Sequence, residues 1–119
     1  MEERRRFVRL PARLSVSATI LPDGRKQEMV SKDISGGGLR LFSDKPLPPG
    51  TQLQLAVTLS GRGEPVNAIG EVVWSETYEV IGRTDRQRSV EIGVRSAEIA
   101  PKDQEAVAAF VASGLSQKL

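Results

Sequence analysis

The sequence contains no cysteine and no histidine. Without these side chains the chain cannot form a disulfide framework, a thiolate or imidazole zinc site, a cysteine nucleophile or a Ser-His-Asp triad. Carboxylates are present, but no pair of them is spaced for acid–base work. The nucleotide-binding patterns G-x-x-x-x-G-K-[ST] and G-x-G-x-x-G do not occur either. We therefore expect that the protein is not an enzyme and that it holds no metal.

Long hydrophobic runs are also missing from the sequence. No stretch approaches the roughly 18 apolar residues of a membrane-spanning helix, and no apolar stretch of a secretory signal follows the arginine-rich start. We expect a cytoplasmic protein with no membrane insertion. The length of 119 residues favours one domain, and the net charge of +2 is only a weak indication of an anionic partner.

Alternation of apolar and polar residues indicates an all-β chain. The pattern predicts six short strands, at 13–20, 27–34, 39–43, 51–60, 66–76 and 89–95. Turn signals separate these strands, among them PDG at 22–24, SGGG at 35–38, DKPLPPG at 44–50, SGRGEP at 60–65 and the polar loop GRTDRQR at 82–88. Within the fifth strand, Gly70 marks a bulge or a close approach of another backbone.

The last part of the chain changes to the period of a helix, which we expect at about 101–113. Pro101 suits the first turn, Asp103 lies near the positive end, and Gly114 is expected as the C-cap. One apolar stripe should face the strands, formed by Val107, Phe110 and Val111. Six strands and one C-terminal helix predict a six-stranded antiparallel β-barrel, because closure removes exposed edges.

The stretch KDISGGGLRL at 32–41 has three glycines where a tight turn needs fewer. A flexible or bulged hairpin is one interpretation. The other interpretation is a ligand-binding site that includes Asp33 and Ser35, because strand alternation places these two residues on one side of the strand end. There a carboxylate can accept two N–H donors of a base, and a hydroxyl can donate to an oxygen. The glycines would allow a flat ring or a phosphate to approach the backbone.

The segment EERRRFVRLP at 2–11 has four arginines in six residues. One interpretation is a solvated basic arm that aids solubility or contacts nucleic acid. The other follows from guanidinium chemistry, because arginine binds phosphate with two hydrogen bonds, stacks on flat rings and can read the edge of guanine. An arginine-rich arm near a carboxylate suits a guanine nucleotide with several phosphates.

Together these motifs resemble those of the PilZ domains, bacterial receptors for cyclic di-GMP. The family signature is R-x-x-x-R in an N-terminal arm, followed by [D/N]-x-S-x-x-G at a strand end. RRFVR supplies the first part as Arg5 and Arg9, and DISGGG supplies the second as Asp33, Ser35 and Gly38. The segments GEVVW at 70–74 and EIGVR at 91–95 are similar to later strands of the family, so the resemblance covers nearly the whole chain.

The resemblance implies that a flexible arm, residues 1–12, wraps the ligand against a barrel domain, residues 13–119. Arg5 and Arg9 would clamp phosphates and guanine faces, Asp33 and Ser35 would read a guanine edge, and Gly38 would keep the path clear. Arg4 precedes the motif, and family members with this feature tend to bind two intercalated cyclic di-GMP molecules. A lone Trp on a strand suits the core, but an aromatic residue at Trp74 can also flank the ligand.

Two functional hypotheses follow. The first is a cyclic di-GMP receptor whose arm becomes ordered on binding, and which then signals to an unidentified protein partner in trans. The second is a small nucleic-acid-binding β-barrel whose basic arm contacts phosphates. Nucleic acid is the weaker hypothesis, because the net charge is small and the five aromatic residues are scattered through the chain. Arg6, Arg40 and Arg95 are auxiliary candidates for contact with the ligand, and they are not counted among the site residues.

Overall fold

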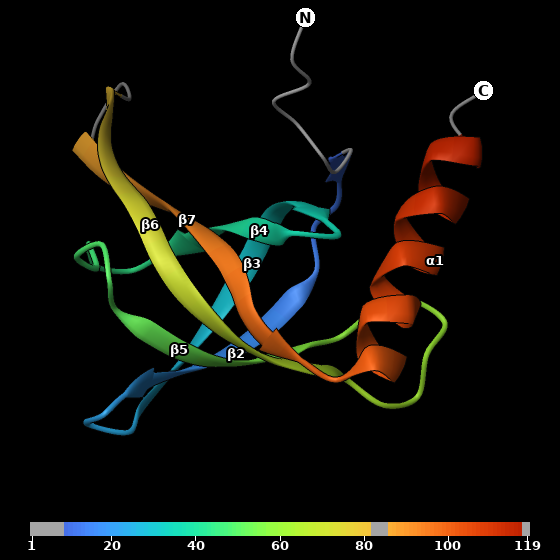
Figure 1. Ribbon diagram of the computed structural model, residues 1–119. Helices are drawn as coiled ribbons and strands as arrows, with labels where there is room; N and C mark the ends of the chain where they lie inside the picture. Colours follow the sequence, from blue (N-terminus) through green and yellow to red (C-terminus); the bar gives the residue numbers. More distant parts are fainter. Residues whose placement is uncertain (1–8, 82–85, 118–119) are drawn as a thin grey trace, which may run out of the picture.

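The computed structural model describes residues 9–81 and 86–117, and its strands form a closed barrel beside one helix (Figure 1). The elements are β1 (Leu10–Pro11), β2 (Ser15–Leu21), β3 (Arg25–Ser35), β4 (Gly38–Ser43), β5 (Gln52–Val57), β6 (Val66–Ile81), β7 (Arg86–Ile99) and α1 (Pro101–Gln117). All strand pairs are antiparallel, in the order β3-β2-β5-β6-β7-β4, and β4 pairs back onto β3. The predicted six-stranded antiparallel barrel is therefore confirmed.

The core lies inside the barrel because each strand alternates apolar and polar residues. Along β2, Val16, Ala18 and Ile20 are buried while the residues between them are partly exposed. Across the barrel, Ile92 and Val94 of β7 point to the same interior. Among the described residues, no helix is long and apolar enough to cross a membrane.

Helix α1 packs its predicted apolar stripe against the barrel and contacts β1, β3 and β6. Its first turn is fixed by the buried Asp103, whose carboxylate accepts hydrogen bonds from the backbone N–H of Asn67 at 3.3 Å and from Arg62 at 3.4 Å. The expected C-cap at Gly114 is wrong, because α1 continues to Gln117. A Cβ on Gly114 would lie 2.4 Å from Leu10 Cδ2, so the glycine permits close packing inside the helix.

The last two strands are longer than the sequence predicts. β6 continues to Ile81 and β7 begins at Arg86, so residues 86–88 of the expected polar loop pair with β6. Backbone hydrogen bonds between β6 and β7 extend this hairpin beyond the barrel. The alternation of apolar and polar residues in the sequence does not indicate such bonds. Gly70 behaves as expected, since the register shifts between Ile69 and Gly70 and an added Cβ would lie 2.4 Å from Val94 Cγ1.

The chain just before β2 is fixed to the barrel. Leu10 is buried and pairs with Ile34, and Pro11 pairs with Asp33, so these two residues of the predicted arm belong to the sheet. The fully buried Ser31 Oγ donates a hydrogen bond to the carbonyl of Ala12 and accepts one from the N–H of Leu14 at 2.9 Å. Residues 1–8 of the predicted arm lie outside the described residues.

Candidate functional site

Asp33 is the centre of the candidate site. It lies near the end of β3, where it pairs with Pro11 of β1 on one side and with Arg40 of β4 on the other. The neighbouring Ile34 points into the core, so Asp33 faces the outside of the barrel. Its side chain is nevertheless only 6% exposed. An ionised carboxylate in such a place needs positively charged partners.

Two arginines provide that charge. Arg40 donates from Nε to Asp33 Oδ2 at 2.7 Å, and its Nη2 contacts the same oxygen. Arg9 Nη1 lies 3.6 Å from the other oxygen, Oδ1, with a side chain that is 43% exposed. The hydrogen bond to Asp33 raises the pKa of Arg40 above its usual value, and the nearby carboxylates add to this effect. The structure thus brings together the predicted pair Arg9 and Asp33, and adds Arg40.

Ser35 shapes the glycine turn between β3 and β4. Its Oγ accepts a hydrogen bond from the N–H of Gly37 at 3.2 Å and donates one to the carbonyl of Gly38 at 3.3 Å. Ser35 and Gly38 are also paired across the hairpin, which leaves Gly36 and Gly37 as the turn. Both interpretations of this stretch, as a tight hairpin and as a site with Asp33 and Ser35 on one side, are compatible with this geometry.

Gly38 is needed for a reason that does not involve a ligand. A Cβ at this position would lie 2.1 Å from the carbonyl oxygen of Val94 on β7. Real Cβ atoms do not approach a backbone oxygen so closely, and a backbone atom cannot rotate away as a side chain can. Gly38 therefore allows β4 to pair with β7 at the end of the barrel.

Trp74 lies on the same outer face as Asp33. Cross-strand pairing gives one lateral row, in which Asp33 pairs with Arg40, Arg40 with Gly93, and Gly93 with Trp74. A Cβ on Gly93 would meet the indole at 2.2 Å from Nε1, so the ring lies across the glycine. Trp74 is half-buried and is not part of the core, which excludes the core interpretation.

A bulge brings Trp74 to that face. Val72 is fully buried, so regular alternation would also direct Trp74 inward. Between them the register shifts, with Val72 opposite Val94 and Trp74 opposite Gly93. The extra residue, Val73, moves the following side chain to the opposite face. The sequence contains no clear signal for this shift.

A second ion pair lies on the same face. Lys32 occupies the irregularity between Ser31 and Asp33, and its Nζ lies 3.2 Å from a carboxylate oxygen of Glu91. Glu91 is also buried, although it lies on the outside of β7. The outer face therefore holds two shielded carboxylates, each with a basic partner. Sequence reasoning missed Lys32 and Glu91, and it named Arg40 as an auxiliary candidate without its partner Asp33, because charged residues on strands do not reveal their cross-strand partners.

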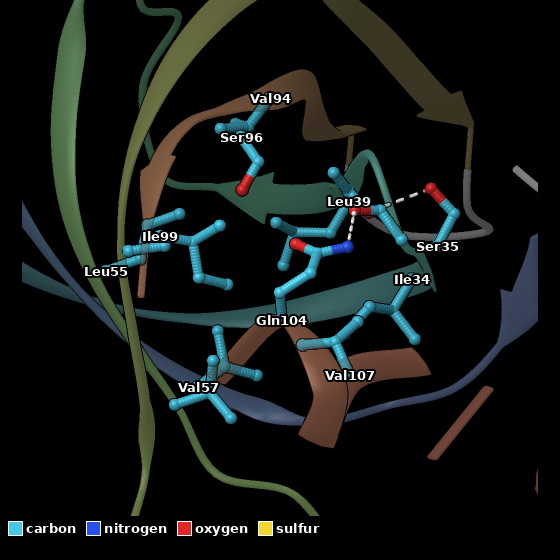
Figure 2. Close-up of a pocket in the computed structure, with 14 residues that line it drawn as sticks. Ile34, Ser35, Leu39, Leu55, Val57, Val94, Ser96, Ile99, Gln104 and Val107 are labelled. Carbon is cyan, nitrogen blue, oxygen red and sulfur yellow. Dashed lines mark hydrogen bonds between the residues drawn. The ribbon is translucent and has the colours of Figure 1, made fainter. Parts of the chain in front are cut away.

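A pocket lies under the glycine turn, between the barrel and α1 (Figure 2). It is lined mostly by apolar side chains, including Val57 and Val107, and no charged residue lines it. Gln104 Nε2 donates a hydrogen bond to the carbonyl of Gly36 at 3.0 Å, which ties the turn to the helix. An apolar pocket does not suit a phosphate-bearing ligand, whereas the outer face with Asp33 does.

Two of the predicted site residues, Arg4 and Arg5, lie outside the described residues. Their roles therefore remain predictions. Within residues 9–81 and 86–117, no three His, Cys, Asp or Glu side chains are grouped so that they could hold a metal ion.

The family model of the PilZ domain matches residues 3–113. The chain belongs to the PilZ domain family. No curated protein matches it. The motif residues Asp33 and Ser35 lie at the end of β3 and Gly38 lies at the start of β4, with Asp33 next to Arg9.

Solved structures share this fold. The c-di-GMP-bound PilZ domain of YcgR from Escherichia coli is 18% identical, with a TM-score of 0.75 and with 98% of this chain and 95% of that chain covered. For the motility inhibitor MotI of Bacillus subtilis the identity is 20% and the TM-score 0.76, with coverages of 98% and 54%. The K. pneumonia MrkH–c-di-GMP complex is 17% identical, with a TM-score of 0.77 and coverages of 99% and 55%. This chain thus spans about half the length of the MotI and MrkH chains.

Proposed function

We propose that this protein is a receptor for cyclic di-GMP. The observation that carries the proposal is the arrangement of Arg9 and Asp33, which are 24 positions apart in the sequence and meet at 3.6 Å in a PilZ domain. Two solved relatives, the YcgR domain and MrkH, are described with c-di-GMP bound. The outer face offers both charges that a guanine dinucleotide requires, a carboxylate for the base and guanidinium groups for the phosphates.

Each residue of the proposed site has a distinct role. Asp33 accepts hydrogen bonds from the N1–H and the 2-amino group of a guanine, and Ser35 binds at the same base edge. Arg5 and Arg9 bind the phosphates and stack on guanine faces. Gly38 leaves the backbone accessible beside the base.

Trp74 provides an aromatic edge for the same ligand. Its indole lies across Gly93, one strand away from Arg40 in the row that leads to Asp33. Cation–π and stacking contacts of such a ring are worth on the order of 0.5–2 kcal/mol each. Arg4, which precedes the arginine motif, supports the binding of a second cyclic di-GMP stacked on the first.

Signalling would follow from the arm. Closing the part of the predicted arm that precedes β1 on a ligand held by Asp33 would create a new surface formed by arm and barrel, and a separate protein partner would bind that surface. New charge-assisted hydrogen bonds offset the entropy that is lost when the arm is ordered. The protein acts in this scheme as an adaptor without chemistry of its own.

Calorimetric titration with cyclic di-GMP tests the proposal. The unaltered protein should bind, with two ligands per chain if Arg4 acts as proposed and one if it does not. Arg9→Ala should abolish binding, and Ser35→Ala should weaken it about tenfold, the value of one or two hydrogen bonds to a bound ligand.

A matched control is Arg25→Ala, which removes an exposed arginine whose ion-pair partner is Asp23 in the β2–β3 turn. It should bind like the unaltered protein. Unchanged affinity of the Arg9 variant would show that the site is assigned wrongly. A folded protein that ignores cyclic di-GMP but binds RNA with a steep salt dependence would instead support the nucleic-acid hypothesis.

A further inference from the structure

The carboxylate of Asp33 is already occupied on one side. Its Oδ2 accepts from both Nε and Nη2 of Arg40, whereas its Oδ1 faces Arg9 at 3.6 Å, beyond the length of a hydrogen bond. A guanine edge presents two parallel donors, N1–H and the 2-amino group, which match the two oxygens of a carboxylate. Among the described residues, only Oδ1 of the two oxygens has no hydrogen bond.

We infer that Arg40 is a competing counterion, which leaves Asp33 when a guanine edge binds and thereby sets the affinity of the site. This inference rests on the proposed function and adds to it a residue that opposes binding. Every ligand that uses both oxygens of Asp33 must first break the ion pair with Arg40. The affinity measured for such a ligand is therefore lower than the intrinsic affinity of the site.

The surroundings of Arg40 explain how it can leave. Its side chain is 32% exposed, five times as much as that of Asp33 at 6%, so the guanidinium can turn toward solvent while the carboxylate cannot. Its neighbour on β7 is Gly93, and the indole of Trp74 lies above that glycine. Glu91 lies near enough to interact with the charge of Arg40, and its carboxylate attracts the guanidinium once that group has left Asp33.

The ion pair between Arg40 and Asp33 also stabilises the site when no ligand is bound. Removing the partners of a shielded carboxylate destabilises the folded protein, because an unpaired charge is then left in a buried place. Arg40 prevents this destabilisation in the absence of ligand, and the guanine donors replace Arg40 when the ligand arrives. Asp33 therefore keeps partners for both oxygens in the bound state and at least one strong partner in the empty state.

The test compares Arg40→Met with Arg13→Met. Methionine keeps most of the aliphatic length and removes the charge. Arg13 is the matched control because its guanidinium lies 5.6 Å from the ring of Phe42, two residues from Arg40 on the same strand. Both variants lose one positive charge near the same face, so both lower the general attraction for phosphates. Arg40→Met should bind cyclic di-GMP about tenfold more tightly than Arg13→Met, because no charged hydrogen bond has to be broken.

Equal or weaker binding by Arg40→Met than by Arg13→Met would overturn the inference, and would mean that Arg40 does not compete or that it contacts the ligand. The proposed function fails differently, when neither the unaltered protein nor any variant binds. The two failures can thus be distinguished in one set of titrations.

A second measurement needs no variant and remains informative if Arg40→Met does not fold. The Nε–H resonance of Arg40 is followed by NMR in the unaltered protein. Saturation with cyclic di-GMP should shift it, whereas cyclic di-inosine monophosphate, which has the same phosphates but no 2-amino group, should leave it in place. If the resonance stays in place with cyclic di-GMP, or moves equally with both ligands, a guanine donor does not replace Arg40 at Asp33 Oδ2 and the inference is overturned.

Discussion

Replacing Gly38 with alanine should destabilise the protein whether or not a ligand is present. The added Cβ would lie 2.1 Å from the carbonyl oxygen of Val94 and 3.0 Å from Cα of Arg95. The closest of these contacts must open from 2.1 Å to at least 3.4 Å to reach ordinary van der Waals contact, and both partners are backbone atoms of a paired strand. Forced overpacking in a packed region costs about 1–3 kcal/mol, and the absence of a movable side chain favours the upper part of that range.

Urea denaturation followed by circular dichroism measures this loss as a change in the free energy of unfolding. The matched control is Gly63→Ala, because an alanine there meets no atom within 4 Å and its backbone is not in a region reserved for glycine. That control should be neutral or up to about 1 kcal/mol more stable, since alanine restricts the unfolded chain. If Gly38→Ala unfolded at the same urea concentration as the unaltered protein, the strand-pairing explanation of this glycine would be refuted.

Three further outcomes are expected. Ser31→Ala should lower the free energy of unfolding by about 1–3 kcal/mol, because the buried N–H and carbonyl that its Oγ joins to β3 lose their partner. Ser75→Ala should raise it by about 1 kcal/mol, since the buried Oγ has no hydrogen-bond partner among the described residues. The carboxyl pKa of Asp23 should lie below its ordinary value in an NMR titration. It should remain low in Arg25→Ala, because the main cause is the backbone N–H of residue 25.

Each of these outcomes can be contradicted directly. Ser31→Ala with unchanged stability would mean that the connection before β2 is not fixed by this hydroxyl. A loss of stability in Ser75→Ala would mean that the hydroxyl has a partner in solution. Recovery of an ordinary Asp23 pKa in Arg25→Ala would show that the guanidinium, and not the backbone, holds the carboxyl in its charged form.

Much of the fold could be predicted because it depends on local patterns. Apolar alternation located all six barrel strands, and closure followed from the need to avoid free edges. The stripe of Val107 and Val111 placed the helix against the barrel. The ends of β6, β7 and α1 could not be predicted in this way, because cross-strand pairing and the packing of Gly114 on Leu10 depend on distant parts of the chain.

For the candidate site, too, the sequence determines one part and the tertiary structure decides another. By itself the sequence determined the family, the barrel and the motif residues Arg9, Asp33 and Ser35, because spacing and residue type are local properties of the chain. Only the tertiary structure decided that a bulge turns Trp74 outward and that Arg40 holds Asp33. The physical reason is that a bulge, and the pairing of one strand with another, fix which side chains meet across the sheet, and neither is written in the order of residues along one strand.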